Sequence, residues 1–138
     1  MNISIKTIPE TEQRYPTTGD YFQSKDGTWN FRISDMGNWK YEFLVALHEL
    51  VEWALAQHKG ITNEQIDDFD FQFEKDRESG LHTDDEEPGN DPKCPVWFEH
   101  QMATVVERMI AGLMGIEWKV YDSTVIETAL NGGNVAAE

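Results

Sequence analysis

The feature that most constrains the fold is an uninterrupted run from Trp39 to Lys59, which contains neither glycine nor proline. Asn38 precedes the run and suits a helix N-cap, while Gly60 follows it and suits a left-handed helix end. Apolar residues recur every three or four positions, as they do on the buried face of a helix: Phe43, Leu47, Leu50 and Ala54. The sequence therefore predicts a helix over 39–59.

This helix contains the sequence His48-Glu49-Leu50-Val51-Glu52. His48 and Glu52 are one turn apart and share a face, whereas Glu49 is rotated by about 100° around the helix axis. Both His48 and Glu52 border the apolar face, so we expect them to be partly buried. Since a buried ionisable group needs a partner, a bound ion between these side chains would satisfy them.

The remaining segments complete an α+β fold, in which an N-terminal β-hairpin or small antiparallel sheet packs on three main helices. Thr62 and Gln65 form a capping box at the start of the second helix. The stripe expected to face the core from the third helix is Phe98, Met102, Val105, Met109 and Leu113. The expected elements are a strand over 3–8, hairpin strands over 21–25 and 28–34, and helices over 62–78 and 96–114.

Length and charge limit the organisation of the chain and its partners. A chain of 138 residues can fill one core but not two, so we expect a single domain over 1–138, with 131–138 as a disordered tail. The formal charge of −15 makes nucleic acid an unexpected partner, because binding to phosphates requires Lys and Arg. No run approaches the roughly 18 apolar residues of a membrane span, and no signal peptide is evident, so we expect a cytoplasmic protein without a membrane partner.

A second histidine can complete a metal site with the first helix. His100 lies on the predicted helix 96–114, which we expect to pack on helix 39–59. Two histidines and one carboxylate form a known catalytic zinc set, so His48, Glu52 and His100 are the predicted ligands. Secondary candidates are four acidic residues on the second and third helices: Glu99, Glu107, Asp70 and Glu74.

The five residues from His48 to Glu52, with the hairpin that precedes them, resemble the zincin metallopeptidases, whose active helix carries His-Glu-x-x-His. The resemblance implies a zincin-like fold, His48 as a metal ligand and Glu49 as the general base that activates the attacking water. The sequence departs from the family pattern at position 52, where glutamate replaces histidine. His100 would supply the missing imidazole.

A second resemblance is to the all-α nucleotide pyrophosphohydrolases of the MazG type, in which Glu-Glu-x-x-Glu and Glu-x-x-Asp helices bind magnesium. Glu49 and Glu52 match part of the first motif, but Ile110 stands where the aspartate after Glu107 would be. Imidazole is also a poor magnesium ligand. The whole chain resembles uncharacterised bacteriophage and prophage proteins as well, and this resemblance implies no activity.

Three hypotheses follow. The first is a zinc-dependent, peptidase-like hydrolase acting on a peptide or small-molecule substrate, with the metal between helices 39–59 and 96–114, and with magnesium or manganese as alternative ions. The second is a small acidic phage or prophage interaction protein with a structural metal or polar cluster. The third is a magnesium-dependent nucleotide pyrophosphohydrolase.

Overall fold

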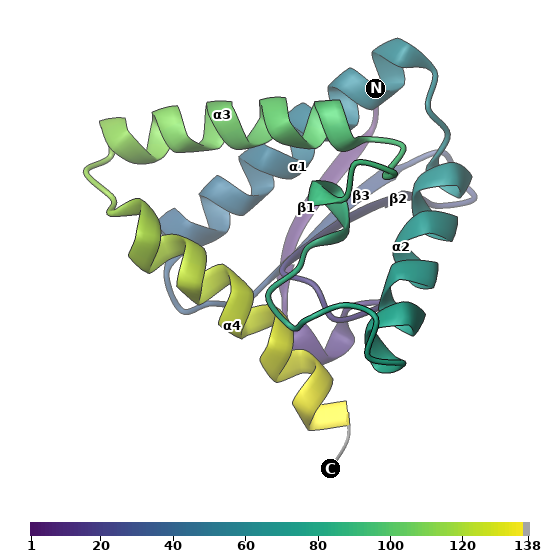
Figure 1. Cartoon of the computed structure of the whole chain (residues 1–138). Helices are drawn as coiled ribbons and strands as arrows, with labels where there is room; N and C mark the ends of the chain where they lie inside the picture. Colours follow the sequence, from purple (N-terminus) through teal and green to yellow (C-terminus); the bar gives the residue numbers. More distant parts are fainter. Residues whose placement is uncertain (137–138) are drawn as a thin grey trace.

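The computed structural model describes residues 1–136 and confirms an α+β fold (Figure 1). The described residues form four long helices and a small three-stranded sheet. The elements in chain order are β1 (Ile3–Ile8), η1 (Glu10–Glu12), β2 (Gly19–Gln23), β3 (Trp29–Ser34), α1 (Trp39–Lys59), α2 (Asn63–Glu78), η2 (Pro88–Asn90), α3 (Trp97–Leu113) and α4 (Trp118–Ala136).

The sheet has the strand order β1-β3-β2 and is mixed. The predicted hairpin is confirmed, because β2 and β3 pair antiparallel with Tyr21 opposite Phe31. The expectation of an antiparallel sheet is wrong for β1, which pairs parallel to β3 with Ile5 opposite Phe31. Parallel pairing requires a connection between the two strands, and β2 lies within that connection. No local pattern in the sequence encodes such a pairing.

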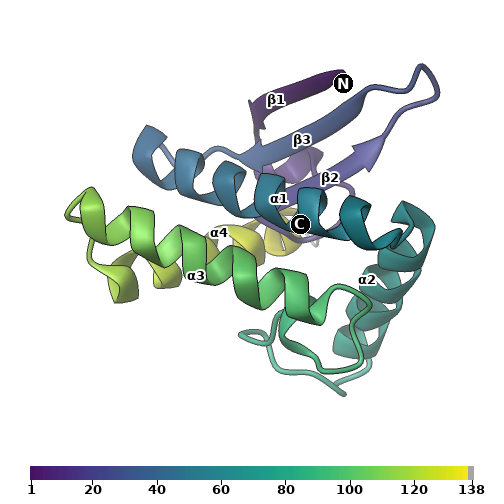
Figure 2. The ribbon, with the colours of Figure 1, turned by 90° about the horizontal axis from the view of Figure 1, so that it is seen from above.

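Helix α1 lies between the sheet and α3 when the molecule is seen from above (Figure 2). The predicted aromatic face of the hairpin packs on α1, with the Phe31 and Trp53 rings meeting edge to face at 5.7 Å. Two clusters of buried side chains join the layers. One contains Tyr21, Phe31, Ala56, Ile66, Cys94 and Val96, and the other contains Ile33, Leu44, Val45, Ala46, Ala111 and Tyr121.

The ends of the first two helices confirm the predicted signals. The Asn38 side chain accepts a hydrogen bond from the Lys40 amide at 3.1 Å, and Gly60 ends α1 with a φ of 75°. Thr62 and Gln65 form the predicted capping box at the start of α2. These local signals fix the residues at which α1 begins and ends, and they therefore fix the positions of His48 and Glu52 along this helix.

The predicted inward face of α3 is wrong. The stripe Phe98, Met102, Val105, Met109 and Leu113 is exposed, from 36% at Met102 to 79% at Leu113. The residues that α3 buries are Glu99, Ala103, Glu107 and Ala111. The two alanines allow α3 to approach α1 closely. The two glutamates meet polar partners, Lys59 for Glu99, and His48 with Tyr121 for Glu107.

The C-terminal segment forms a fourth long helix, α4, in addition to the three main helices that the sequence predicts. It extends through Ala136, past the start of the predicted disordered tail 131–138, and positions 137–138 lie outside the described residues. Tyr121 anchors α4 in the core with 1% exposure. Within residues 1–136, none of the helices combines the length and apolarity needed to cross a membrane.

Candidate metal centre

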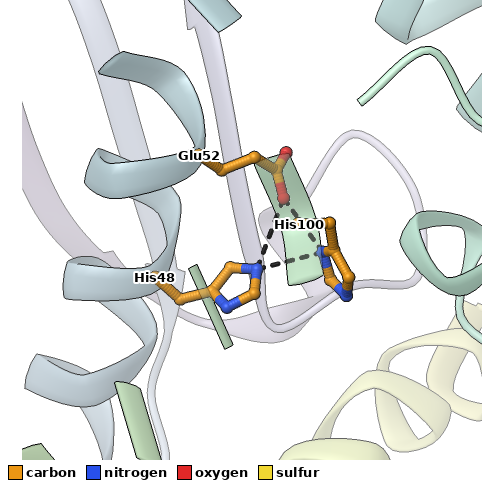
Figure 3. A group of neighbouring side chains, drawn as sticks. All are labelled: His48, Glu52 and His100. Carbon is orange, nitrogen blue, oxygen red and sulfur yellow. Dashed lines mark hydrogen bonds and ion pairs between the residues drawn. The ribbon is translucent and has the colours of Figure 1, made fainter. Parts of the chain in front are cut away.

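Three of the predicted ligands converge between α1 and α3 (Figure 3). His48 and Glu52 extend from successive turns of α1, and His100 extends toward them from the first turn of α3. His48 Nε2 lies 3.0 Å from His100 Nδ1 and 3.3 Å from Glu52 Oε2, and His100 Nδ1 lies 2.9 Å from the same oxygen. One atom from each residue thus forms a compact triangle.

The triangle has the size that a tetrahedrally coordinated ion requires. Ligand atoms about 2.0–2.1 Å from a zinc ion at tetrahedral angles lie about 3.3 Å apart. The three observed edges run from 2.9 to 3.3 Å, so the spacing of the three ligand atoms fits such an ion. His48 is 8% exposed and Glu52 is 7% exposed, so these two ligand candidates are largely shielded from water.

The outer atom of each imidazole contacts a carboxylate. His48 Nδ1 lies 2.8 Å from Glu107 Oε1, and His100 Nε2 lies 3.6 Å from Glu87 Oε2. A carboxylate partner favours a proton on the nitrogen that faces it, which leaves the other nitrogen of a neutral imidazole with its lone pair. Two lone pairs and a carboxylate oxygen then face one another within 3.3 Å, and this arrangement is favourable only with a cation or protons between them.

Two tyrosines hold the carboxylates in place. The Tyr21 hydroxyl of β2 donates to Glu52 Oε1 at 2.9 Å, so the other oxygen of Glu52 is the one that faces the histidines. The Tyr121 hydroxyl of α4 donates to Glu107 Oε2, while the opposite oxygen of Glu107 faces His48. Such outer contacts orient ligands and increase their basicity in metalloproteins.

The electrostatics of the centre favour negative carboxylates and a positive charge among them. Burial opposes the ionisation of Glu52, but hydrogen bonds from His100 and His48 lower its pKa to about 2. Burial likewise disfavours a charged His100, but Glu52 and Glu87 raise its pKa to about 9. Without a metal, positive charge at this centre comes from protons on the imidazoles, and a divalent ion would have to displace those protons.

Glu49, the predicted general base, lies beside the triangle. Burial, together with the charge of Glu52, raises the pKa of Glu49 to about 8. Gly19 of β2 provides the space for this carboxyl group, because a Cβ at position 19 would lie 2.7 Å from Glu49 Oε1. A positive ion at the neighbouring triangle would favour the ionised form of Glu49.

A cavity of about 770 Å³ opens onto the centre and is lined by His48, Glu49, Glu52 and His100. Its described lining includes thirteen acidic residues and two arginines. The loop between α2 and α3 contributes part of this wall through residues 84–90 and Cys94. The cavity can therefore hold a substrate, and its charge favours neutral or cationic groups over polyanions.

The secondary candidates lie at different distances from the centre. Glu107 contacts His48 from outside the triangle, as described above. Glu99 points elsewhere and pairs with Lys59 Nζ at 2.6 Å. Asp70 lines the cavity and accepts from the Tyr15 hydroxyl at 3.3 Å, whereas Glu74 pairs with Arg77 at 3.1 Å. None of these four contributes to the group of converging ligand atoms found in the described residues.

Sequence reasoning missed the groups that support the centre, namely Tyr21, Tyr121, Glu87 and Gly89. The tyrosines carry no distinguishing signal, because an aromatic residue on a strand or helix most often indicates core packing. Glu87 and Gly89 belong to the loop between α2 and α3, where only the acidic run and the loop length suggested a role.

Comparison of the chain with protein-family models, with curated proteins and with solved structures finds no match. The function must therefore be inferred from the centre and the cavity.

Proposed function

We propose that the chain is a zinc-dependent hydrolase, with His48, Glu52 and His100 as the metal ligands. The observation that carries the proposal is the convergence of two imidazole nitrogens and one carboxylate oxygen within 3.3 Å, each backed on its far side by another polar residue. Histidines that bind a metal almost always contact such an outer partner through their other ring nitrogen, and both His48 and His100 do so.

The donor set favours zinc over magnesium. Two imidazoles and a carboxylate suit zinc or manganese, while magnesium prefers oxygen ligands and retains several waters. A zinc ion with three protein ligands supplies a Lewis acid and lowers the pKa of water bound to it. The cavity on the open side of the triangle leaves space for water and substrate.

The side chains around the ion would then have separate roles. His48, Glu52 and His100 hold the ion, and Glu107 and Tyr121 orient His48. Glu49 accepts the proton of the attacking water and transfers it to the leaving group, as a carboxylate beside the reacting atoms can do. A positive ion at the triangle would favour the ionised form of Glu49, which is the form that can accept this proton.

The proposed substrate class is an amide, as in a peptide, on the basis of the resemblance to the zincin metallopeptidases, and the charge of the cavity favours neutral or cationic neighbouring groups. Many carboxylates and few arginines surround the space, so a polyphosphate would meet repulsion unless several metal ions accompanied it. This charge distribution ranks the peptidase hypothesis above the nucleotide pyrophosphohydrolase hypothesis.

Metal analysis of protein purified without added metal tests the metal centre. We expect about one zinc ion per chain in the wild type, and a loss of most of it in His48→Ala and in His100→Ala. His58→Ala is the matched control, since His58 is exposed near the end of α1. Absence of zinc from the wild type, with no uptake on addition, would remove the proposal.

Activity measurements test the reaction. We expect cleavage of members of a fluorogenic peptide library, and a loss of about 100-fold or more in Glu49→Gln with zinc content unchanged. Zinc without any hydrolysis in the wild type would indicate a structural centre in an interaction protein. Magnesium-dependent release of pyrophosphate from nucleoside triphosphates would instead support the pyrophosphohydrolase hypothesis.

A further inference from the structure

The outer face of α3 is an apolar surface that the fold leaves uncovered. Five side chains form it at helical spacing, and we refer to them together as the α3 stripe: Phe98, Met102, Val105, Met109 and Leu113. Helix α1 packs on one side of α3 (Figure 2), and the residues Glu99, Ala103, Glu107 and Ala111 are buried, whereas the stripe residues are exposed. Among the described residues, no element packs over it.

The area of the stripe is sufficient for a specific interface. Its members are exposed by 36% to 79%, which leaves roughly 500 Å² of apolar surface if a large side chain offers on the order of 150–250 Å². An apolar patch of this size is at the upper end of what monomeric proteins expose. Two such faces in contact would bury roughly 1,000 Å², the lower bound for a stable protein interface.

The charge distribution on α3 also favours this face as an interface. The chain carries a net charge of −15, so two copies repel each other across most of their surface. The acidic residues of α3, Glu99 and Glu107, are buried, and Arg108 is the one exposed charged residue on this helix, all of which the structure describes. Arg108 lies over the Trp118 ring of α4 at 5.0 Å, and Lys59 lies over the Phe98 ring at 4.3 Å and pairs with Glu99. Helix α3 therefore exposes no acidic side chain that would repel a second copy.

The spacing of the stripe is self-complementary. If two α3 helices pack antiparallel about a two-fold axis between positions 105 and 106, Phe98 meets Leu113 of the second copy and Met102 meets its Met109. Val105 then lies against Val106 at the centre, where the smaller side chains allow the helices to approach. A two-fold interface requires a surface that matches itself in this way.

We infer that a second copy of this chain covers the α3 stripe, forming a symmetric dimer through antiparallel α3 helices. The inference is independent of the proposed metal chemistry, because the stripe and the ligands lie on opposite sides of α3.

Sedimentation equilibrium of the full chain tests the surface. We expect the wild type to be dimeric at micromolar concentration, and Val105→Glu to raise the dimer dissociation constant by about 100-fold or more. Val120→Glu is the matched control, because Val120 is 51% exposed on α4, outside the stripe. A monomeric wild type, or a Val105→Glu variant as dimeric as the wild type, would overturn the inference. Circular dichroism establishes that each variant is folded.

Paired charges test the antiparallel arrangement. The double variant Met102→Glu/Met109→Glu places like charges opposite each other and should be monomeric. Met102→Glu/Met109→Lys places opposite charges together across the two-fold axis and should recover dimerisation by at least about 10-fold relative to the first double variant. Equal dissociation constants for the two double variants would overturn this arrangement.

Discussion

Whether each buried carboxyl group is ionised depends on the groups within hydrogen-bonding distance of it. Glu52 meets a tyrosine hydroxyl and two imidazoles, and its pKa is about 2. Asp70 borders the same cavity, and among the described residues its carboxyl group has one hydrogen-bonding partner, the Tyr15 hydroxyl. Burial, together with the charge of Glu52, raises the pKa of Asp70 to about 8. The cavity wall therefore combines ionised and neutral carboxyl groups near neutral pH.

The raised pKa of Asp70 predicts a pH-dependent stability. In the unfolded chain this carboxyl group titrates near 3.8, so the folded protein binds the extra proton between about pH 4 and pH 8. Its contribution to stability is complete below pH 4 and is lost as the pH rises through about 8. In metal-free protein, the free energy of unfolding by urea should fall less steeply over this range in Asp70→Asn than in the wild type. Asp68→Asn, exposed on the same helix, should keep the wild-type slope, and parallel curves for Asp70→Asn and wild type would contradict the assignment.

Glu107 makes the outer contact of His48, and removing its charge should weaken metal binding. Its carboxylate faces His48 Nδ1, so it orients the ring and increases the basicity of the opposite nitrogen. We expect Glu107→Gln, which keeps the size but removes the charge, to weaken zinc binding by about 10- to 100-fold in a chelator competition assay. Glu117→Gln serves as the control, because Glu117 is exposed. Equal affinity in both variants would show that His48 needs no such support.

At the scale of elements, the short η2 segment controls the position of one ligand. Gly89 of η2 lies against the His100 ring, and a Cβ there would stand 2.5 Å from Cγ and 2.7 Å from Cε1 of the ring. Such contacts are too short, so either the ring or η2 must move. The absence of a side chain at position 89 therefore allows His100 to reach the centre.

Gly89→Ala should consequently weaken zinc binding by about 10-fold or more while leaving the fold intact, since a displaced ligand loses its coordination geometry. Isothermal titration of the metal-free protein provides the measurement. Gly112→Ala is the matched control, because nothing lies within 4 Å of a Cβ there, and helix propensity predicts a gain of up to about 1 kcal/mol in stability. Wild-type affinity in Gly89→Ala would mean that η2 does not constrain His100.

At the scale of the whole molecule, the centre connects elements that are distant in the sequence. His48 and Glu52 belong to α1 and His100 to α3, while Tyr21 reaches Glu52 from β2 and Tyr121 reaches Glu107 from α4. An ion at the centre would link the two central helices directly. The folded state would then bind the ion much more tightly than the unfolded chain does.

Zinc should therefore raise the melting temperature. Free zinc at about 100 times its dissociation constant stabilises a folded protein by about 2.7 kcal/mol, which corresponds to roughly 10 °C for a domain of this size. Differential scanning calorimetry with and without zinc provides the measurement. Magnesium at the same concentration should have little effect, and a zinc-induced shift that persists in the His48→Ala/His100→Ala double variant would contradict the proposed ligands.

Local patterns in the sequence determined much of the helical framework. The absence of glycine and proline from 39–59, the Asn38 cap and the Gly60 end predicted α1 with its observed bounds. The spacing of His48 and Glu52 placed both side chains on one face of that helix. These features depend on residues within a few positions of one another, which is why they can be recognised without a structure.

Only the tertiary structure decided which face of α3 is buried. Helical periodicity permits two inward faces, the α3 stripe or the residues Glu99, Ala103, Glu107 and Ala111, and hydrophobicity favours the stripe. The structure buries the second face, because Glu99 meets Lys59 there and Glu107 meets His48 and Tyr121. Burial of a carboxylate depends on partners that come from distant parts of the chain, and only the folded arrangement brings those partners to it.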